Sequence, residues 1–155
     1  EKLAVCREHG ADAGIDYATE DLRERVKAIT GGTGADVVFD PVGGDLAEAA
    51  LRCIAWEGRY AVIGFAAGAI PQFPANYLLV KNVEAVGVHG GAYVKHYPDV
   101  VARGMAELLD WYVAGSLKPR VHASLPLEQV DEAFALVAGR KVEGKVVLTT
   151  GAEDA

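Results

Sequence analysis

Segments typical of helices and of strands alternate along the whole chain, and this alternation most constrains its fold. Asp36–Asp40 is a continuous β-branched and aromatic run, which is typical of a strand covered on both faces. Gly58–Gly64 and Val83–Val88 are predicted to be the next two strands. The alternation predicts an α/β fold with a mostly parallel sheet and helices on its faces. Because ligands bind at the carboxyl ends of such strands, the informative positions follow these three runs.

Helical periodicity places helices between and after these strands. The predicted helices are Glu1–His9, Asp21–Ile29, a segment beginning after Asp45, a long one from Pro98 to near Gly115, and Pro126–Ala138. Thr19 is the predicted N-cap of the second helix, and Asp45 that of the third, with Glu48 completing a capping box. The third helix is expected to bury Leu46, Ala49, Ala50, Cys53 and Ile54. Ala13–Tyr17 is expected to be a short extended strand.

The pattern changes after Gly115. Val121–Leu125, the helix that follows Pro126, and Lys145–Thr149 form a separate strand–helix–strand group. This group is the first indication that the chain holds more than one structural part.

Composition excludes several classes of function. The 155 residues are 51% hydrophobic and 24% charged, which fits a soluble globular protein, and a cytoplasmic location is the default expectation. The net charge of -7 and the scattered Lys and Arg residues argue against a nucleic-acid partner. No apolar run approaches the roughly 20 residues that span a membrane. Cys6 and Cys53 are expected to be reduced and buried, and no metal-ligand spacing accompanies them.

Four segments carry a resemblance to a known family. They are Asp40–Asp45 (DPVGGD), Gly58–Phe65 (GRYAVIGF), Pro74–Asn82 (PANYLLVKN) and Gly144–Leu148 (GKVVL). In order and spacing they resemble the medium-chain dehydrogenase/reductase superfamily, and within it the zinc-independent quinone oxidoreductase branch. The similarity runs from Glu1 to about Thr149.

The resemblance predicts which part of such an enzyme this chain represents. Family members enter the nucleotide-binding domain through a glycine-rich turn, and the chain contains no G-x-G-x-x-G, so we expect it to begin inside the second helix of that domain. Residues 1–116 would be part of a dinucleotide-binding domain, 117–150 the C-terminal part of the catalytic domain, and 151–155 a tail. The implied fold is a partial doubly wound, Rossmann-like parallel sheet without its first two strands, plus a β-α-β segment. Such a chain alone is expected to be poorly stable, because Asp36–Asp40 would expose an apolar edge. It is also expected to be inactive, because the catalytic N-terminal domain and the glycine-rich turn would be missing.

The resemblance implies NADP as the cofactor, with NAD less favoured, and no metal. It places the ribose near Val42 and Gly43 and the nicotinamide near Gly64 and Phe65. Glycines at strand ends let a backbone approach a ligand closely, although both glycines also suit a tight turn.

Five further residues complete the expected sites. Lys2 lies where relatives hold the extra phosphate of NADP, and a lysine ammonium suits that charge. Tyr17 matches a tyrosine that flanks the same adenosine end, or it is simply a half-exposed tyrosine at a strand end. Val88 and His89 would face the nicotinamide and substrate pocket, and Lys145 is placed in the cofactor site. His89 is either a proton donor or a pocket-lining side chain.

Asp40 has two possible roles: an acid or base, or a cap of the loop at the strand end. Short polar residues before proline often cap such loops. No catalytic side chain is assigned, because hydride transfer belongs to the cofactor.

The leading hypothesis is an NADPH-dependent reductase of a small-molecule quinone or a related activated alkene or carbonyl. The alternatives are a zinc alcohol dehydrogenase or enoyl reductase on the same fold, and a non-catalytic truncated module. By analogy with the family, Val83–Val88 is expected to pair across a two-fold axis in a homodimer.

Overall fold

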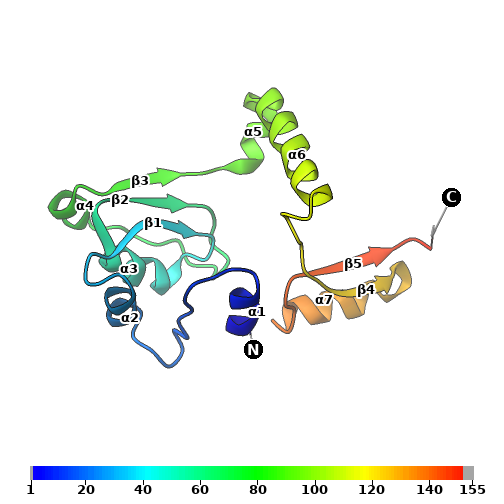
Figure 1. The fold of residues 1–155 in the computed structure, drawn as a ribbon, viewed down its shortest axis with the longest axis horizontal. Coiled ribbons are helices and arrows are strands. Elements are labelled where there is room, and N and C mark those ends of the chain that lie inside the picture. Colours follow the sequence, from blue (N-terminus) through cyan, green and yellow to red (C-terminus); the bar gives the residue numbers. More distant parts are fainter. Residues whose placement is uncertain (1, 152–155) are drawn as a thin grey trace. The chain divides into compact units, whose positions relative to one another are not determined.

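The structure, a computed structural model, describes residues 2–151, and it contains two compact units. One unit is Cys6–Pro98, and the other combines the chain before Cys6 with the chain from Asp99 onward. The boundary expected after residue 116 concerns which domain of a complete enzyme each segment belongs to, so it stays a prediction. Residues 152–155 of the expected tail lie outside the described residues. The elements are α1 (Lys2–Glu8), α2 (Leu22–Ile29), β1 (Ala35–Asp40), α3 (Gly44–Cys53), β2 (Ile54–Val62), α4 (Ala75–Lys81), β3 (Glu84–Gly87), α5 (Gly90–His96), α6 (Pro98–Val113), β4 (Val121–Pro126), a 3-10 turn (Leu127–Gln129), α7 (Val130–Ala138) and β5 (Lys145–Thr149) (Figure 1).

A three-stranded parallel sheet is the centre of the Cys6–Pro98 unit. Its strand order is β1-β2-β3, so the three strands predicted to be neighbours are neighbours (Figure 1). Phe39 is paired with Ala61, and Ala61 with Val86, so the carboxyl ends of all three strands lie at one edge of the sheet. The predicted α/β fold with parallel sheets is confirmed.

The core of this unit lies on one face of the sheet. Ala47 and Leu51 of α3 pack with Ile54 and Tyr60 of β2, and all four are at most 1% exposed. On the other face, Val37 is 64% and Phe39 70% exposed. The expectation that β1 is covered on both faces is therefore wrong for this chain, and it is covered on one. Burying the Leu51 side chain contributes about 2 kcal/mol of transfer free energy.

Helix α3 begins earlier than predicted and presents a different stripe to the core. Gly43, not Asp45, is the N-cap, with a φ of 70° and a ψ of -150°. Because glycine has no side chain, no side-chain hydrogen bond caps the first turn. Glu48 pairs with Arg52 at 2.6 Å and takes no part in a capping box. The buried positions are Ala47, Leu51 and Cys53, whereas Leu46, Ala49 and Ala50 are half-buried.

Lys81 ties α4 to the amino-terminal end of β2. Its Nζ donates to the carbonyl oxygens of Arg52 at 3.2 Å and Ile54 at 2.6 Å. These carbonyls lie at the C-terminal end of α3, where a cation also interacts favourably with the helix dipole. Lys81 therefore joins three elements at the edge of the sheet opposite the strand ends.

The segment before α2 contains two corrections. Ala13–Tyr17 forms no strand, because no neighbouring strand offers it a hydrogen-bond ladder; Asp16 instead accepts turn hydrogen bonds from the Ala18, Thr19 and Glu20 amides. The N-cap of α2 is Asp21, whose side chain accepts from the Glu24 amide at 2.9 Å, and not Thr19. Of the two free cysteines, Cys53 is buried as expected and Cys6 is exposed.

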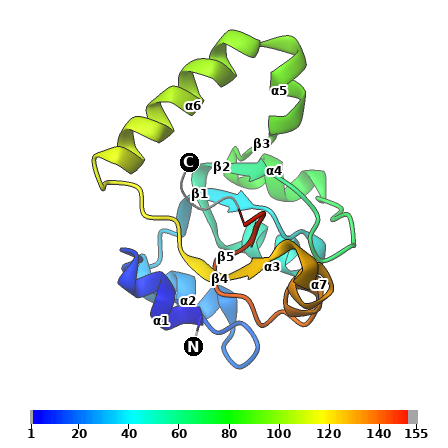
Figure 2. The ribbon, with the colours of Figure 1, turned by 90° about the vertical axis from the view of Figure 1, so that its right-hand side faces the viewer.

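The other unit contains the predicted strand–helix–strand group. Strands β4 and β5 pair in parallel, with Leu125 opposite Leu148, and α7 lies beside them (Figure 2). At the start of this pairing, Arg120 forms an ion pair with Glu143 at 3.0 Å. Gly144 has a φ of 112°, and a Cβ there would overlap the Arg120 carbonyl oxygen. Only glycine therefore fits at position 144.

Candidate functional site

The loops that leave β1 and β2 are joined at the carboxyl edge of the sheet. The main-chain oxygen of Asp40 accepts hydrogen bonds from the amides of Ile63 at 2.9 Å and Gly64 at 3.3 Å. Farther along, a Cβ on Gly43 would lie 3.0 Å from Cδ1 of Phe65. The predicted pairs Val42–Gly43 and Gly64–Phe65 are therefore brought together by the fold.

The side chain of Asp40 organises the first of these loops. Its Oδ1 accepts from the amides of Val42 at 2.8 Å and Gly43 at 2.9 Å, and its Oδ2 accepts from the Tyr60 hydroxyl at 2.7 Å. Of the two roles left open for Asp40, the observed bonds are those of the loop cap. A carboxylate that accepts three hydrogen bonds in a buried site is well solvated by the protein.

These contacts shift the pKa values of both partners. Burial alone raises the pKa of the Asp40 carboxyl, but the hydrogen bonds from the Gly43 amide, the Tyr60 hydroxyl and the Val42 amide outweigh it, so that pKa is lowered. Burial, and next the bond to the Asp40 carboxylate, raise the pKa of Tyr60. Asp40 is thus an anion and Tyr60 a neutral donor at neutral pH.

The lowered pKa predicts how stability depends on acid. A carboxyl whose pKa is lower in the folded state stabilises it at any pH above its unfolded pKa of about 3.9. This contribution is lost as the pH falls from about 4 through the lowered pKa. We expect the urea midpoint of the protein to fall over that interval, and Asp40→Asn to remove part of the fall. An equal fall in both proteins would contradict the assignment.

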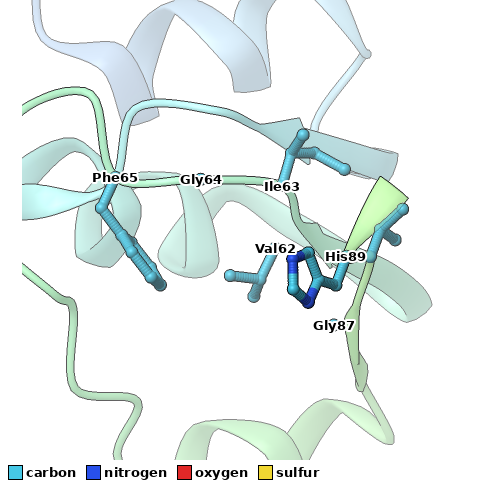
Figure 3. Close-up of a pocket in the computed structure, with 7 residues that line it drawn as sticks. Val62, Ile63, Gly64, Phe65, Gly87 and His89 are labelled. Carbon is cyan, nitrogen blue, oxygen red and sulfur yellow. The ribbon is translucent and has the colours of Figure 1, made fainter. Parts of the chain in front are cut away.

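A cavity of about 490 Å³ opens where β2 and β3 end. Val62, Ile63, Gly64 and Phe65 line it from one side and Gly87, Val88 and His89 from the other. Figure 3 shows the Phe65 and His89 rings on either side of Val62. The structure thus brings together four predicted residues, Gly64, Phe65, Val88 and His89, in a mainly apolar pocket with one ionisable side chain.

Two other predicted residues line a second cavity, of about 420 Å³, in the unit that contains β4 and β5. Lys2 and Lys145 lie there with Arg140, and Lys2 Nζ donates to the Arg140 carbonyl at 2.8 Å. Tyr17, which is 62% exposed, is not among the residues that line either cavity.

Sequence reasoning missed Arg140 and Tyr60. Arg140 follows Gly139 at the end of α7, and a Gly-Arg-Lys sequence after a helix was the available signal. The role of Tyr60 depends on which strand neighbours which, and a single tyrosine in a strand does not reveal that.

Two searches of the described part of the chain bear on other chemistries. Within residues 2–151, no group of three or more His, Cys, Asp or Glu side chains is arranged to hold a metal ion. No helix in this range has the length and apolar character needed to cross a bilayer.

Comparison with known proteins identifies relatives over nearly the whole chain. The model of the family described as "Zinc-binding dehydrogenase" matches residues 9–148. Quinone oxidoreductase-like protein 2 homolog of Nematostella vectensis is 46% identical over 151 residues, which are 97% of this chain and 41% of that protein. Quinone oxidoreductase-like protein 2 of Bos taurus is 40% identical over 96% of this chain and 43% of its own length. The chain thus spans about two fifths of these relatives.

Solved structures agree with these relatives. Escherichia coli quinone oxidoreductase complexed with NADPH has a TM-score of 0.83 at 28% identity, over 94% of this chain and 45% of that one. An NAD-dependent alcohol dehydrogenase has a TM-score of 0.78 at 31% identity, over 96% of this chain and 41% of that one. Together with the family match, these similarities show that the chain belongs to the zinc-binding dehydrogenase family, in the quinone oxidoreductase branch of the medium-chain dehydrogenase/reductase superfamily.

Proposed function

We propose that the protein produced from the complete gene transfers a hydride from NADPH to a quinone or to a related activated alkene or carbonyl compound. The observation that carries this proposal is the apolar cavity at the carboxyl ends of β2 and β3, beside the loop of Val42 and Gly43. In open α/β sheets this edge is where ligands bind. The likeness to a quinone oxidoreductase complexed with NADPH supports the choice of cofactor.

The backbone around the cavity fits the flat end of a dinucleotide. A Cβ on Gly64 would meet only the Pro41 carbonyl, at 3.4 Å, and a Cβ on Gly87 would meet nothing within 4 Å. A planar ring can therefore approach both main chains closely. The bound nicotinamide would supply the hydride, which is chemistry that belongs to the cofactor.

The residues of this chain would position the ring and exclude water. Val62, Phe65 and Val88 present apolar surface to the cavity, and a dry site protects a hydride donor from side reactions. Among the lining residues His89 alone has a polar side chain, and we assign it a pocket-lining role.

The basic cavity supports NADP over NAD. Lys2, Arg140 and Lys145 place three cationic side chains around one cavity, and Lys2 keeps two further N–H donors besides its bond to Arg140. An arginine and lysines together suit a phosphate monoester, which carries close to two negative charges. We propose that this cavity receives the phosphate that distinguishes NADP from NAD.

Replacing Lys145 with methionine tests that assignment. The change keeps the length of the side chain and removes its charge, so we expect the Kd for NADPH to rise about tenfold. The Kd for NADH should change by less than about twofold, because NADH has no phosphate at this position. Parallel fluorescence titrations with the two cofactors measure both values. An equal loss for NADPH and NADH would contradict the assignment.

The overall proposal is tested by assaying the protein from its complete gene with a simple quinone. We expect NADPH to be oxidised faster than NADH, and a zinc chelator to leave the rate unchanged. The similarity to an NAD-dependent alcohol dehydrogenase makes that activity the second candidate. Preference for NADH with loss of activity on chelation would favour it, and absence of cofactor binding would contradict both.

We also propose a homodimer formed through β3. This strand is at one edge of its sheet, and its residues Glu84–Gly87 are all exposed. A second copy of the strand could extend the sheet across a two-fold axis. Light scattering on the protein from its complete gene would report twice the monomer mass.

A further inference from the structure

Asp40 is the one buried charged side chain among the described residues, at 8% exposure. Burying a charge is costly unless hydrogen bonds replace the water that it loses. Three donors meet this carboxylate: the amides of Val42 and Gly43 and the hydroxyl of Tyr60. An apolar residue at this position would cost less free energy to bury than a carboxylate does. Stability alone therefore does not explain why a carboxylate with three donors is found here.

The oxygen atoms of Asp40 accept hydrogen bonds from both loops of the proposed cofactor site. Its side chain holds Val42 and Gly43, and its main-chain oxygen accepts from Ile63 and Gly64. The relative position of the two loops thus depends on the last residue of β1. The second loop is in turn bonded to the first, since the Ala67 amide donates to the Val42 carbonyl at 2.9 Å.

Tyr60 fixes the orientation of the carboxylate. Its ring is fully buried and packs edge-on against Phe73, with centroids 4.8 Å apart and planes at 62°. The hydroxyl donates to Oδ2 of Asp40 at 2.7 Å, and its only other acceptor among the described residues, the Ala47 carbonyl oxygen, is farther away at 3.5 Å. With Oδ2 held there, Oδ1 remains directed at the two loop amides.

We propose that Asp40 and Tyr60 form a positioning pair that holds the Val42–Gly43 turn in the conformation that receives the ribose and nicotinamide end of NADPH. This role rests on the proposed function. It also assigns a chemical selectivity to the turn. A fixed anion beneath the amino end of α3 offsets the helix dipole that would otherwise attract phosphate. The turn therefore takes neutral hydroxyl and carboxamide groups, and the phosphates are bound elsewhere.

Three variants of the protein from its complete gene test the pair, with the Kd for NADPH measured by fluorescence titration. Asp40→Ala removes every side-chain bond to the loop, so we expect the Kd to rise about thirtyfold or more. Tyr60→Phe removes only the hydroxyl, so we expect a rise of about five- to tenfold. Asp40→Asn keeps an oxygen for the two amides, so it should stay within about threefold of the unmodified protein.

Lys81→Met is the matched control. It removes two side-chain hydrogen bonds from the same unit, at the opposite end of β2, so it should lower the Tm but leave the Kd unchanged. If Asp40→Ala does not fold, Tyr60→Phe and Asp40→Asn still decide the question. Unchanged Kd values in the Asp40→Ala and Tyr60→Phe proteins, or a loss in Lys81→Met as large as in Tyr60→Phe, would overturn the positioning role alone. If the unmodified protein binds no NADPH, the proposed function and this role both fail.

Discussion

Replacing Gly34 with alanine is expected to destabilise the Cys6–Pro98 unit by about 3 kcal/mol or more, which is among the largest effects of a single methyl group. Gly34 has a φ of 93°, and its missing Cβ would overlap the Cys53 carbonyl oxygen and lie 3.0 Å from the Ala55 nitrogen. Both neighbours are backbone atoms where α3 becomes β2, so neither can move without disturbing the core. Thermal unfolding should show a Tm lower by roughly 10 to 20 °C.

Gly32 provides a matched control two residues away. Its φ is 92°, but a Cβ there would meet nothing within 4 Å. Gly32→Ala should therefore lower the free energy of unfolding only by the cost of a left-handed backbone for alanine, about 1 kcal/mol. The difference between the two variants isolates the overlap with Cys53. Equal Tm values for the two variants would show that β1 can shift away from α3.

The order of the three sheet strands and the edge that forms the site could be predicted from local patterns, although Ala13–Tyr17 forms no strand and β2 begins at Ile54, before the predicted Gly58. β5 is Lys145–Thr149, as its apolar run indicates, and β1, β2 and β3 are neighbours in the expected order. Parallel strands end at one edge of a sheet, so the sequence was enough to bring Gly64 and His89 to one cavity. Strand periodicity and the rules of parallel sheets predict this part of the fold, because neither requires knowledge of contacts between residues far apart in the sequence.

The start of α3 could not be predicted in this way. Asp45 and Glu48 fit a local capping pattern, yet Asp40, from the end of the preceding strand, accepts the amides that precede the helix. Tertiary contacts outcompete the local cap because the Asp40 carboxylate is already held in place by Tyr60. The buried stripe lies one residue later than predicted at Ala47 and Leu51, whereas Cys53 is buried as predicted.

The basic cavity shows a second limit. Lys2 and Arg140 are 138 positions apart in the chain, and their contact joins a helix to the residue that follows α7. No periodicity or spacing connects two such positions. The resemblance to a family could propose Lys2 and Lys145 one at a time, but only the fold adds Arg140 to them.

Replacing Gly43 with alanine is expected to raise the Kd for NADPH about thirtyfold, the largest effect that we predict for a single methyl group in the cofactor site. Gly43 has a φ of 70° and a ψ of -150°, a region that is essentially restricted to glycine. A Cβ there would also lie 3.0 Å from Phe65 Cδ1 and 3.1 Å from the Ala69 carbonyl oxygen. Relieving this strain of about 2 kcal/mol requires the turn to leave its present conformation.

The loss should concern binding more than folding, because the same movement breaks the bond from the Gly43 amide to Asp40. Gly68→Ala is the control: Gly68 has a φ of 85° in the neighbouring loop, but a Cβ there would meet nothing within 4 Å. It should lose a similar amount of backbone stability and keep its affinity for NADPH within about twofold. Titrations of both variants, each with its Tm, separate the two effects. If Gly43→Ala bound NADPH as the unmodified protein does, the cofactor would not approach this turn, and the site would have to be sought away from the end of β1.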